Sequence, residues 1–182
     1  FSQGNYKVGN GAYEFEGAGD YVDVEDEENF DFNITNFTVS AWINLDVNGV
    51  GPYSIVSKSR DQWTFELYGG ELNFQFDAST RNYGSTTLST DEWHYVTAVR
   101  NGTSVLLYLN GVEETPGGLW DGCPEELGNV AYNLTFGTRP EGTPNFNGTI
   151  DEVMIFNRSL SASEIKELYI KGRVSWQYSD YK

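Results

Sequence analysis

The sequence has little of several residue types. Its 182 residues include one cysteine and one histidine. Because Cys123 has no second cysteine to pair with, neither an internal disulfide scaffold nor a cysteine-rich zinc site can form. His94 has no second histidine and no nearby Ser or Cys nucleophile signature, which favours a structural role over a catalytic one. No run of about 18 apolar residues is present, so we expect no insertion into a membrane.

Basic residues are also few. There are 11 Lys and Arg against 27 Asp and Glu, and the net charge is −16. A field of this sign repels phosphate backbones, so nucleic acid is not expected as a partner. The charge is uneven, since residues 8–57 contain ten acids and no Lys or Arg, whereas residues 158–182 contain five basic and three acidic residues. This asymmetry would permit head-to-tail contacts between copies of the chain.

Aromatic residues and glycine are abundant, at 15% and 20 residues respectively, which suits many short strands joined by turns. Two hairpins are indicated by Gly69-Gly70 and Asn110-Gly111, because these pairs accept the positive φ angles of tight turns. There is no alternation of strands with helices, so the pattern predicts a single all-β domain. The predicted strands are 12–15, 21–24, 38–43, 65–68, 72–76, 94–100, 105–109, 134–138 and 150–156.

One helix is predicted near the C-terminus. Ser161 and Glu164 have the spacing of a capping box, and Leu160 and Ile165 have that of a hydrophobic staple around it. Gly172 is a candidate for the residue that ends the helix.

The segment after this glycine alternates apolar and polar residues, which is a strand pattern. We therefore predict a domain of residues 1–172 and a C-terminal extension of residues 173–182. The extension is either a last edge strand or a flexible tail, or else a strand exchanged with a second copy. In the last case Val174, Trp176 and Tyr178 would mediate self-association.

Six Asn-x-Ser/Thr sequons occur, which is more than the composition leads one to expect. They predict a glycoprotein that is extracellular or located at the cell surface. The alternative is that some of them are strand or turn positions with Thr on a β-surface. The sequon residues are Asn33, Asn36, Asn101, Asn133, Asn147 and Asn157.

Several stretches carry a family pattern, above all Trp93-His94 followed by YLNG, and the IDEV block that leads into the capped helix. On these residues the chain resembles the concanavalin A-like lectin/glucanase superfamily, and within it the laminin-G-like and pentraxin-like jelly-roll domains. The resemblance implies a two-sheet antiparallel jelly-roll β-sandwich with one short C-terminal helix. It also implies bound Ca²⁺ in many members and glycan or protein ligands in some. The matching stretches are 12–24, 36–45, 53–59, 65–74, 91–112, 134–139 and 147–169.

The resemblance brings forward Asp20 and Asp151 as partners in a structural Ca²⁺ site, completed by backbone carbonyls near Gly17. The alternative is that both are turn carboxylates hydrogen-bonded to backbone amides. A second, pentraxin-like site at the rim would use Asp61 and Glu141, although arginines lie beside both acids in the sequence.

Three aromatic residues lie outside the family's core pattern, in or next to polar loops. They are Trp63, Tyr83 and Trp120. An exposed ring can stack on the apolar face of a sugar while neighbouring polar groups such as Asp61 bind its hydroxyls. Trp42 and Trp93, by contrast, are expected to pack in the interior.

Catalysis is not expected. Glucanases of this superfamily carry Glu-x-Asp-x-x-Glu on one strand, and the nearest run here has Tyr21 where the first Glu would be needed. We therefore predict a non-catalytic, extracellular binding or adhesion module, carbohydrate-binding with structural calcium, whose partner is a glycan or a cell-surface protein. The main alternative is a self-assembling homo-oligomer or polymer of a cell-surface layer or filament, and the less favoured one is a glycoside hydrolase.

Overall fold

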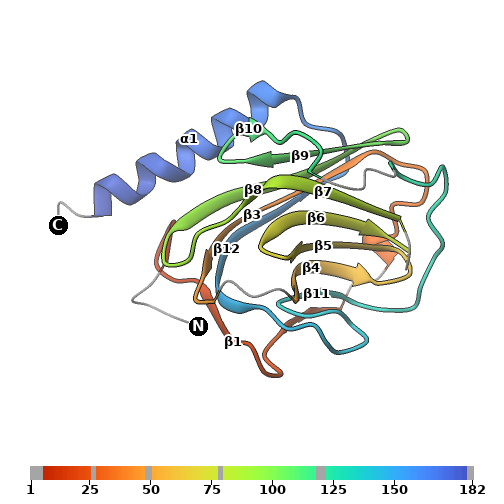
Figure 1. The fold of residues 1–182 in the computed structure, drawn as a ribbon, viewed down its shortest axis with the longest axis horizontal. Coiled ribbons are helices and arrows are strands. Elements are labelled where there is room, and N and C mark those ends of the chain that lie inside the picture. The colour runs from red at the N-terminus through yellow and green to blue at the C-terminus, as the bar shows by residue number, and fades with distance from the viewer. Residues whose placement is uncertain (1–5, 26–27, 48–50, 78–79, 118–121, 180–182) are drawn as a thin grey trace.

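The chain forms two antiparallel sheets that pack face to face, with one long helix across the outside of the first (Figure 1). The computed structural model describes residues 6–25, 28–47, 51–77, 80–117 and 122–179. In those residues the first sheet has the order β1-β12-β3-β8-β9-β10, and the second has the order β2-β11-β4-β5-β6-β7. This architecture confirms the predicted jelly-roll sandwich.

The strands, in chain order, follow the predicted pattern closely. Gly69, Gly70, Asn110 and Gly111 all have positive φ, as expected for the two tight hairpins. The element bounds are β1 Tyr13–Glu16, β2 Val22–Val24, the 3₁₀ turn η1 Glu28–Phe30, β3 Phe37–Leu45, β4 Pro52–Ser59, β5 Trp63–Tyr68, β6 Glu71–Phe76, β7 Thr80–Thr87, β8 Trp93–Asn101, β9 Ser104–Leu109, β10 Val112–Glu113, β11 Leu134–Phe136, β12 Asn147–Phe156 and α1 Ala162–Ser179.

Every residue of β3 is buried, because both faces of the first sheet are covered. Val39, Ala41 and Ile43 point into the main core between the sheets. Trp42 points the other way, into a second apolar cluster beneath α1. Its ring lies 5.6 Å from that of Tyr169 on the helix, so the packing role predicted for this tryptophan is confirmed.

The start of α1 is the one that the sequence predicts. The backbone N–H of Ser161 donates to Glu164 Oε2 at 2.9 Å, and the backbone N–H of Glu164 donates to Ser161 Oγ at 3.3 Å, which is the reciprocal pair of a capping box. Leu160 and Ile165 are both buried in the cluster beneath the helix. No helix among the described residues is both long enough and apolar enough to cross a membrane.

The end of α1 differs from the prediction. The helix continues to Ser179, so Gly172 does not end it and residues 173–179 are not a strand. A helix that has already formed extends at little cost, which outweighs a period-two pattern of a few residues. Val174, Trp176 and Tyr178 therefore lie on a helix, and the proposed exchange of a strand between copies has no strand to act through.

Glycine is needed at position 172 because the helix lies close to Trp42, and not because the helix ends there. A Cβ atom at this position would lie 2.3 Å from Trp42 Nε1 and 2.8 Å from Trp42 Cε2. Only a residue without a side chain lets the helix approach the indole ring this closely.

We therefore expect Gly172→Ala to destabilise the fold. Alanine favours a helix by about 1 kcal/mol over glycine, but the clash with Trp42 is expected to reverse the sign and lower the free energy of unfolding by about 1–3 kcal/mol. Urea denaturation measures the change, and a Trp42→Phe background, which removes part of the indole, should reduce it. A gain in stability in the wild-type background would contradict the close approach.

Candidate functional site

The outer face of the second sheet carries a row of polar side chains that crosses all six strands. We call it the polar row. Its members are register partners on neighbouring strands, so they point to the same face. Their chain neighbours, such as Phe65 and Phe74, point into the core. The members are Asp23, Thr135, Ser57, Thr64, Gln75 and Arg81.

The centre of this face is closed by the segment between β11 and β12. Arg139 Nη2 donates to Glu66 Oε2 at 2.6 Å and to Gln75 Oε1 at 3.2 Å. Asn73 Nδ2 donates to the other oxygen of the same carboxylate at 2.7 Å. Burial raises the pKa of Glu66, and the neighbouring Arg139 opposes that rise. A buried ion pair therefore fixes this segment to the sheet.

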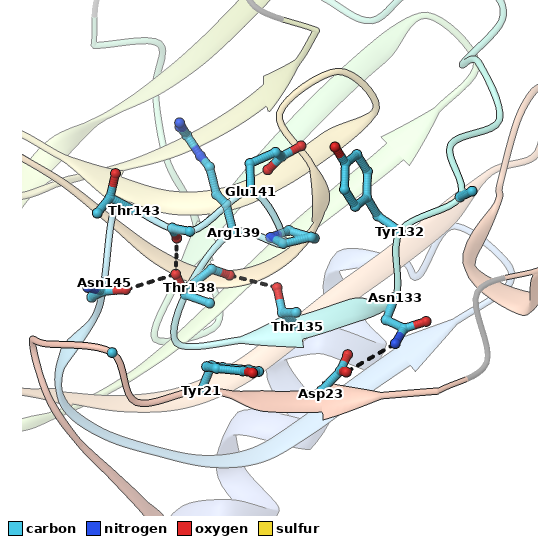
Figure 2. A pocket seen from close by; sticks show the side chains of 14 residues that line it. Tyr21, Asp23, Tyr132, Asn133, Thr135, Thr138, Arg139, Glu141, Thr143 and Asn145 are labelled. Atoms are coloured by element: carbon cyan, nitrogen blue, oxygen red, sulfur yellow. Dashed lines mark hydrogen bonds between the residues drawn. The ribbon is translucent and has the colours of Figure 1, made fainter.

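An open pocket of about 650 Å³ lies beside the ion pair, between β2, β11 and the loop 138–145 (Figure 2). Two tyrosine rings on its walls are accessible to solvent, Tyr21 at 59% and Tyr132 at 42%. The pocket is lined by Gly19, Tyr21, Asp23, Ala131, Tyr132, Asn133, Thr135, Thr138, Arg139, Pro140, Glu141, Gly142, Thr143 and Asn145.

Hydrogen bonds hold the pocket walls in place. Asn133 Nδ2 donates to Asp23 Oδ2 at 3.0 Å, which joins β11 to β2. Thr135 Oγ1 donates to the carbonyl of Thr138 at 2.7 Å, and Thr138 Oγ1 donates to Asn145 Oδ1 at 2.9 Å (Figure 2). The loop is thus fixed to the strand below it, and the pocket is preformed.

The structure corrects one predicted ligand residue. Trp63 is fully buried, its ring stacks on Phe74 at 6.0 Å with 9° between the planes, and its Nε1–H donates to the carbonyl of Phe30 at 3.3 Å. The polar loop next to it in sequence led to the error, because the first residue of a strand can still point inward. Trp120 lies outside the described residues.

The other predicted ligand residues lie at separate places on the second sheet. Tyr83 is near its far edge, where its hydroxyl accepts a bond from Arg81 at 3.1 Å and its ring lies 5.8 Å from that of Tyr68. Glu141 lines the pocket and accepts a hydrogen bond from the backbone N–H of Arg60 at 3.2 Å. Asp61 follows Arg60 in the turn between β4 and β5, but it does not line the pocket.

Sequence reasoning missed the two tyrosines of the pocket. Tyr21 alternates with the half-buried Val22, so its outward direction is visible in the sequence. Tyr132 gives no such signal, because it precedes β11 in an irregular segment and lines the same pocket as Tyr21 only because β11 pairs with β2.

The comparisons with known proteins agree with the two-sheet fold. The family model described as the concanavalin A-like lectin/glucanases superfamily, in its laminin-G form, matches residues 16–166. The chain belongs to the concanavalin A-like lectin/glucanase superfamily. The adhesion G-protein coupled receptor V1 of Danio rerio is 28% identical over 152 residues, which cover 75% of this chain and 2% of the receptor.

Solved structures share the superfamily's fold with this chain at low identity. The CBM40 module of Ruminococcus gnavus IT-sialidase, bound to α2,3-sialyllactose, matches with a TM-score of 0.69 and 12% identity, over 87% of this chain and 95% of the module. Trypanosoma rangeli sialidase matches with a TM-score of 0.67 and 16% identity, over 88% of this chain and 27% of the sialidase. The chain therefore corresponds to one part of the receptor and of the sialidase.

The residues expected to hold the superfamily's calcium are not gathered into one site. Asp151 Oδ2 accepts the backbone N–H groups of Lys7 and Val8, each at 2.8 Å, and Oδ1 accepts that of Glu152. Asp20 Oδ2 accepts the backbone N–H of Glu16 at 2.9 Å. Both carboxylates thus bond to backbone amides, as in the alternative interpretation.

Strand geometry separates the two acids. Asp20 is bonded to Glu16, and Glu16 pairs with Asn147 on β12. Asp151 lies four residues further along β12, which corresponds to about 13 Å. Gly17 packs instead against the side chain of Asn147. Among the described residues no three His, Cys, Asp or Glu side chains are placed to hold a metal ion. The arrangement of Asp20, Asp151 and Gly17 does not fit Ca²⁺.

The six sequons lie at three places in the structure. Four lie at one end of the first sheet, where β3 begins and where β8 and β12 end: Asn33, Asn36, Asn101 and Asn157. Asn147 begins β12 at the other end. Asn133 lines the pocket, where its side-chain amide is bonded to Asp23.

Proposed function

We propose that this chain is an extracellular, non-catalytic binding module that holds a carbohydrate in the pocket between β2, β11 and the loop 138–145. The observation that carries the proposal is the pair of exposed tyrosine rings on the walls of a preformed polar pocket. An aromatic ring stacks on the apolar face of a sugar, while carboxylate, amide and hydroxyl groups bind the sugar hydroxyls. The pocket volume falls within the range of about 300–1,000 Å³ typical of ligand sites.

The surroundings of Glu66 support a non-catalytic role. Glycoside hydrolysis needs two carboxyl groups flanking the bond, about 5–9.5 Å apart. The charged groups that influence the Glu66 carboxyl are both arginines, Arg139 and Arg81, and neither is the second carboxyl that hydrolysis needs. An acid and nucleophile pair also needs one carboxyl in an apolar setting, and the carboxylates that line the pocket, Asp23 and Glu141, are both exposed.

An extracellular location is supported by the adhesion receptor relative and by the sequons. Asn33, Asn101 and Asn157 are exposed, so their side chains are accessible for modification. Glycans attached at these positions would stand at one end of the first sheet, whereas the pocket lies on the second. None of these three residues lines the pocket.

Substitution of the pocket tyrosines tests the proposal. We expect Tyr21→Ala and Tyr132→Ala each to weaken binding on a glycan array by about fivefold, because each removes a stacking surface worth about 1 kcal/mol. Both residues are exposed, so the thermal unfolding midpoint should change little.

The matched control is Tyr13→Ala, which removes an equally exposed tyrosine from β1 of the other sheet. Binding should be unchanged in this variant. Equal weakening by Tyr13→Ala, or parental binding by both pocket variants, would place the ligand elsewhere. No binding of the parent to any glycan would reject the proposed function.

A further inference from the structure

The exposed charged residues that line the pocket are of one sign. Asp23 and Glu141 line it, and both are exposed. Arg139 also lines the pocket, but its guanidinium group is turned to the buried Glu66 and away from Tyr21 and Asp23 (Figure 2).

A second nearby cation is also directed inward. Lys58 has a fully buried side chain whose Nζ lies 3.4 Å from Asp31 and donates to the carbonyl of Tyr132 at 2.6 Å. Both of these cationic side chains are thus engaged with buried or half-buried acids. Arg60, whose backbone N–H donates to Glu141, is exposed but does not line the pocket. The net charge of −16 adds to the negative potential at the pocket.

We infer that the ligand of this pocket is an uncharged sugar, and that sialylated and sulfated glycans are excluded from it. This inference rests on the proposed function. A sugar carboxylate or sulfate needs a cationic or N–H partner to offset its loss of water, and here it would meet two carboxylates instead. Neutral sugar hydroxyls, by contrast, donate to carboxylates in charge-assisted hydrogen bonds.

The inference gives this chain a ligand of different charge from that of its structural neighbour. The Ruminococcus gnavus module was solved with sialyllactose, an anionic ligand, and shares the fold at 12% identity. Ligand charge is set by side chains rather than by the sandwich, so the shared fold does not carry over the ligand. The specificity of this chain follows from Asp23, Glu141 and the inward direction of Arg139.

Matched pairs of glycans test the inference on the full chain. Each pair consists of a neutral glycan and the same glycan bearing a sialic acid or a sulfate. We expect the neutral member to bind about tenfold more tightly, and the ratio to grow at low salt, where the repulsion is less screened. Equal or tighter binding of the anionic members overturns the inference and leaves the proposed function standing. Absence of binding to both members overturns both.

Charge-neutralising variants locate the source of the selectivity. Asp23→Asn and Glu141→Gln should each reduce the neutral-to-anionic ratio several-fold, because each removes one carboxylate from the pocket. Glu167→Gln, on the exposed face of α1, changes the net charge by the same amount and should leave the ratio unchanged. An equal effect of Glu167→Gln would assign the selectivity to the whole protein's charge and overturn the inference.

Discussion

Replacing Arg139 by methionine is expected to lower the free energy of unfolding by about 3–5 kcal/mol at neutral pH, because it removes the cation that is bonded to a buried carboxylate. Glu66 is fully buried, and Arg139 Nη2 lies 2.6 Å from its Oε2. Asn73 would remain as a hydrogen-bond donor to the other oxygen, but it carries no charge. Urea denaturation of the wild type and the variant measures the loss.

The loss should depend on pH. Burial already raises the pKa of Glu66, and removal of Arg139 removes the opposing influence, so the pKa rises further in the variant. A carboxyl with a raised pKa in the folded state binds more protons than the unfolded chain, so folding is favoured as the pH falls into that window. We therefore expect the deficit of Arg139→Met to be smaller at about pH 5 than at pH 7. An equal deficit at both pH values would show that the charge of Glu66 is not the cause.

Two controls separate the buried ion pair from arginine loss in general. Arg158→Met breaks an ion pair of similar length with Glu164, 2.7 Å, but both side chains are about half exposed, so little change is expected. The double variant Glu66→Gln/Arg139→Met removes both charges and should recover much of the loss. Failure of the double variant to recover stability would assign the loss to packing of the arginine stem.

The features predicted correctly from the sequence depend on local interactions. The hairpin glycines act through their own φ angles, and the capping box of Ser161 and Glu164 joins residues three apart. The alternation of Leu72 and Phe74 with polar residues fixes which face of β6 enters the core. Such signals remain readable because no distant residue is needed to interpret them.

The features that were missed depend on residues far apart in the sequence. Gly172 is explained only by Trp42, and the role of Asp151 only by the backbone of Lys7 and Val8. The register of β11 against β2 creates the pocket by pairing segments more than 100 residues apart. A turn carboxylate that binds distant amides has the same sequence signature as a calcium ligand, which is why the two interpretations could not be separated before the fold was known.

Trp63 was also missed because its neighbours in the fold are distant in the sequence. Its replacement is the second substitution with a large expected effect on stability. We expect Trp63→Ala to lower the free energy of unfolding by about 3–5 kcal/mol, because it leaves a large cavity in the main core. The indole lies among rings from three other segments, with centroid distances of 5.3 Å to Phe37, 6.0 Å to Phe32 and 6.0 Å to Phe74. The carbonyl of Phe30 also loses the hydrogen bond from Nε1.

A ligand role and a core role for Trp63 predict opposite results. Trp63→Phe keeps most of the apolar volume, so it should fold with a smaller loss of stability and bind glycans as the parent does. Tyr132→Ala should behave in the reverse way, with parental stability and weakened binding, because its ring is exposed in the pocket. Denaturation and glycan-array binding, measured on both variants, distinguish the roles. Parental stability with lost binding in Trp63→Phe would return this tryptophan to the ligand surface, whereas the stacking of its ring on Phe74 places it in the core.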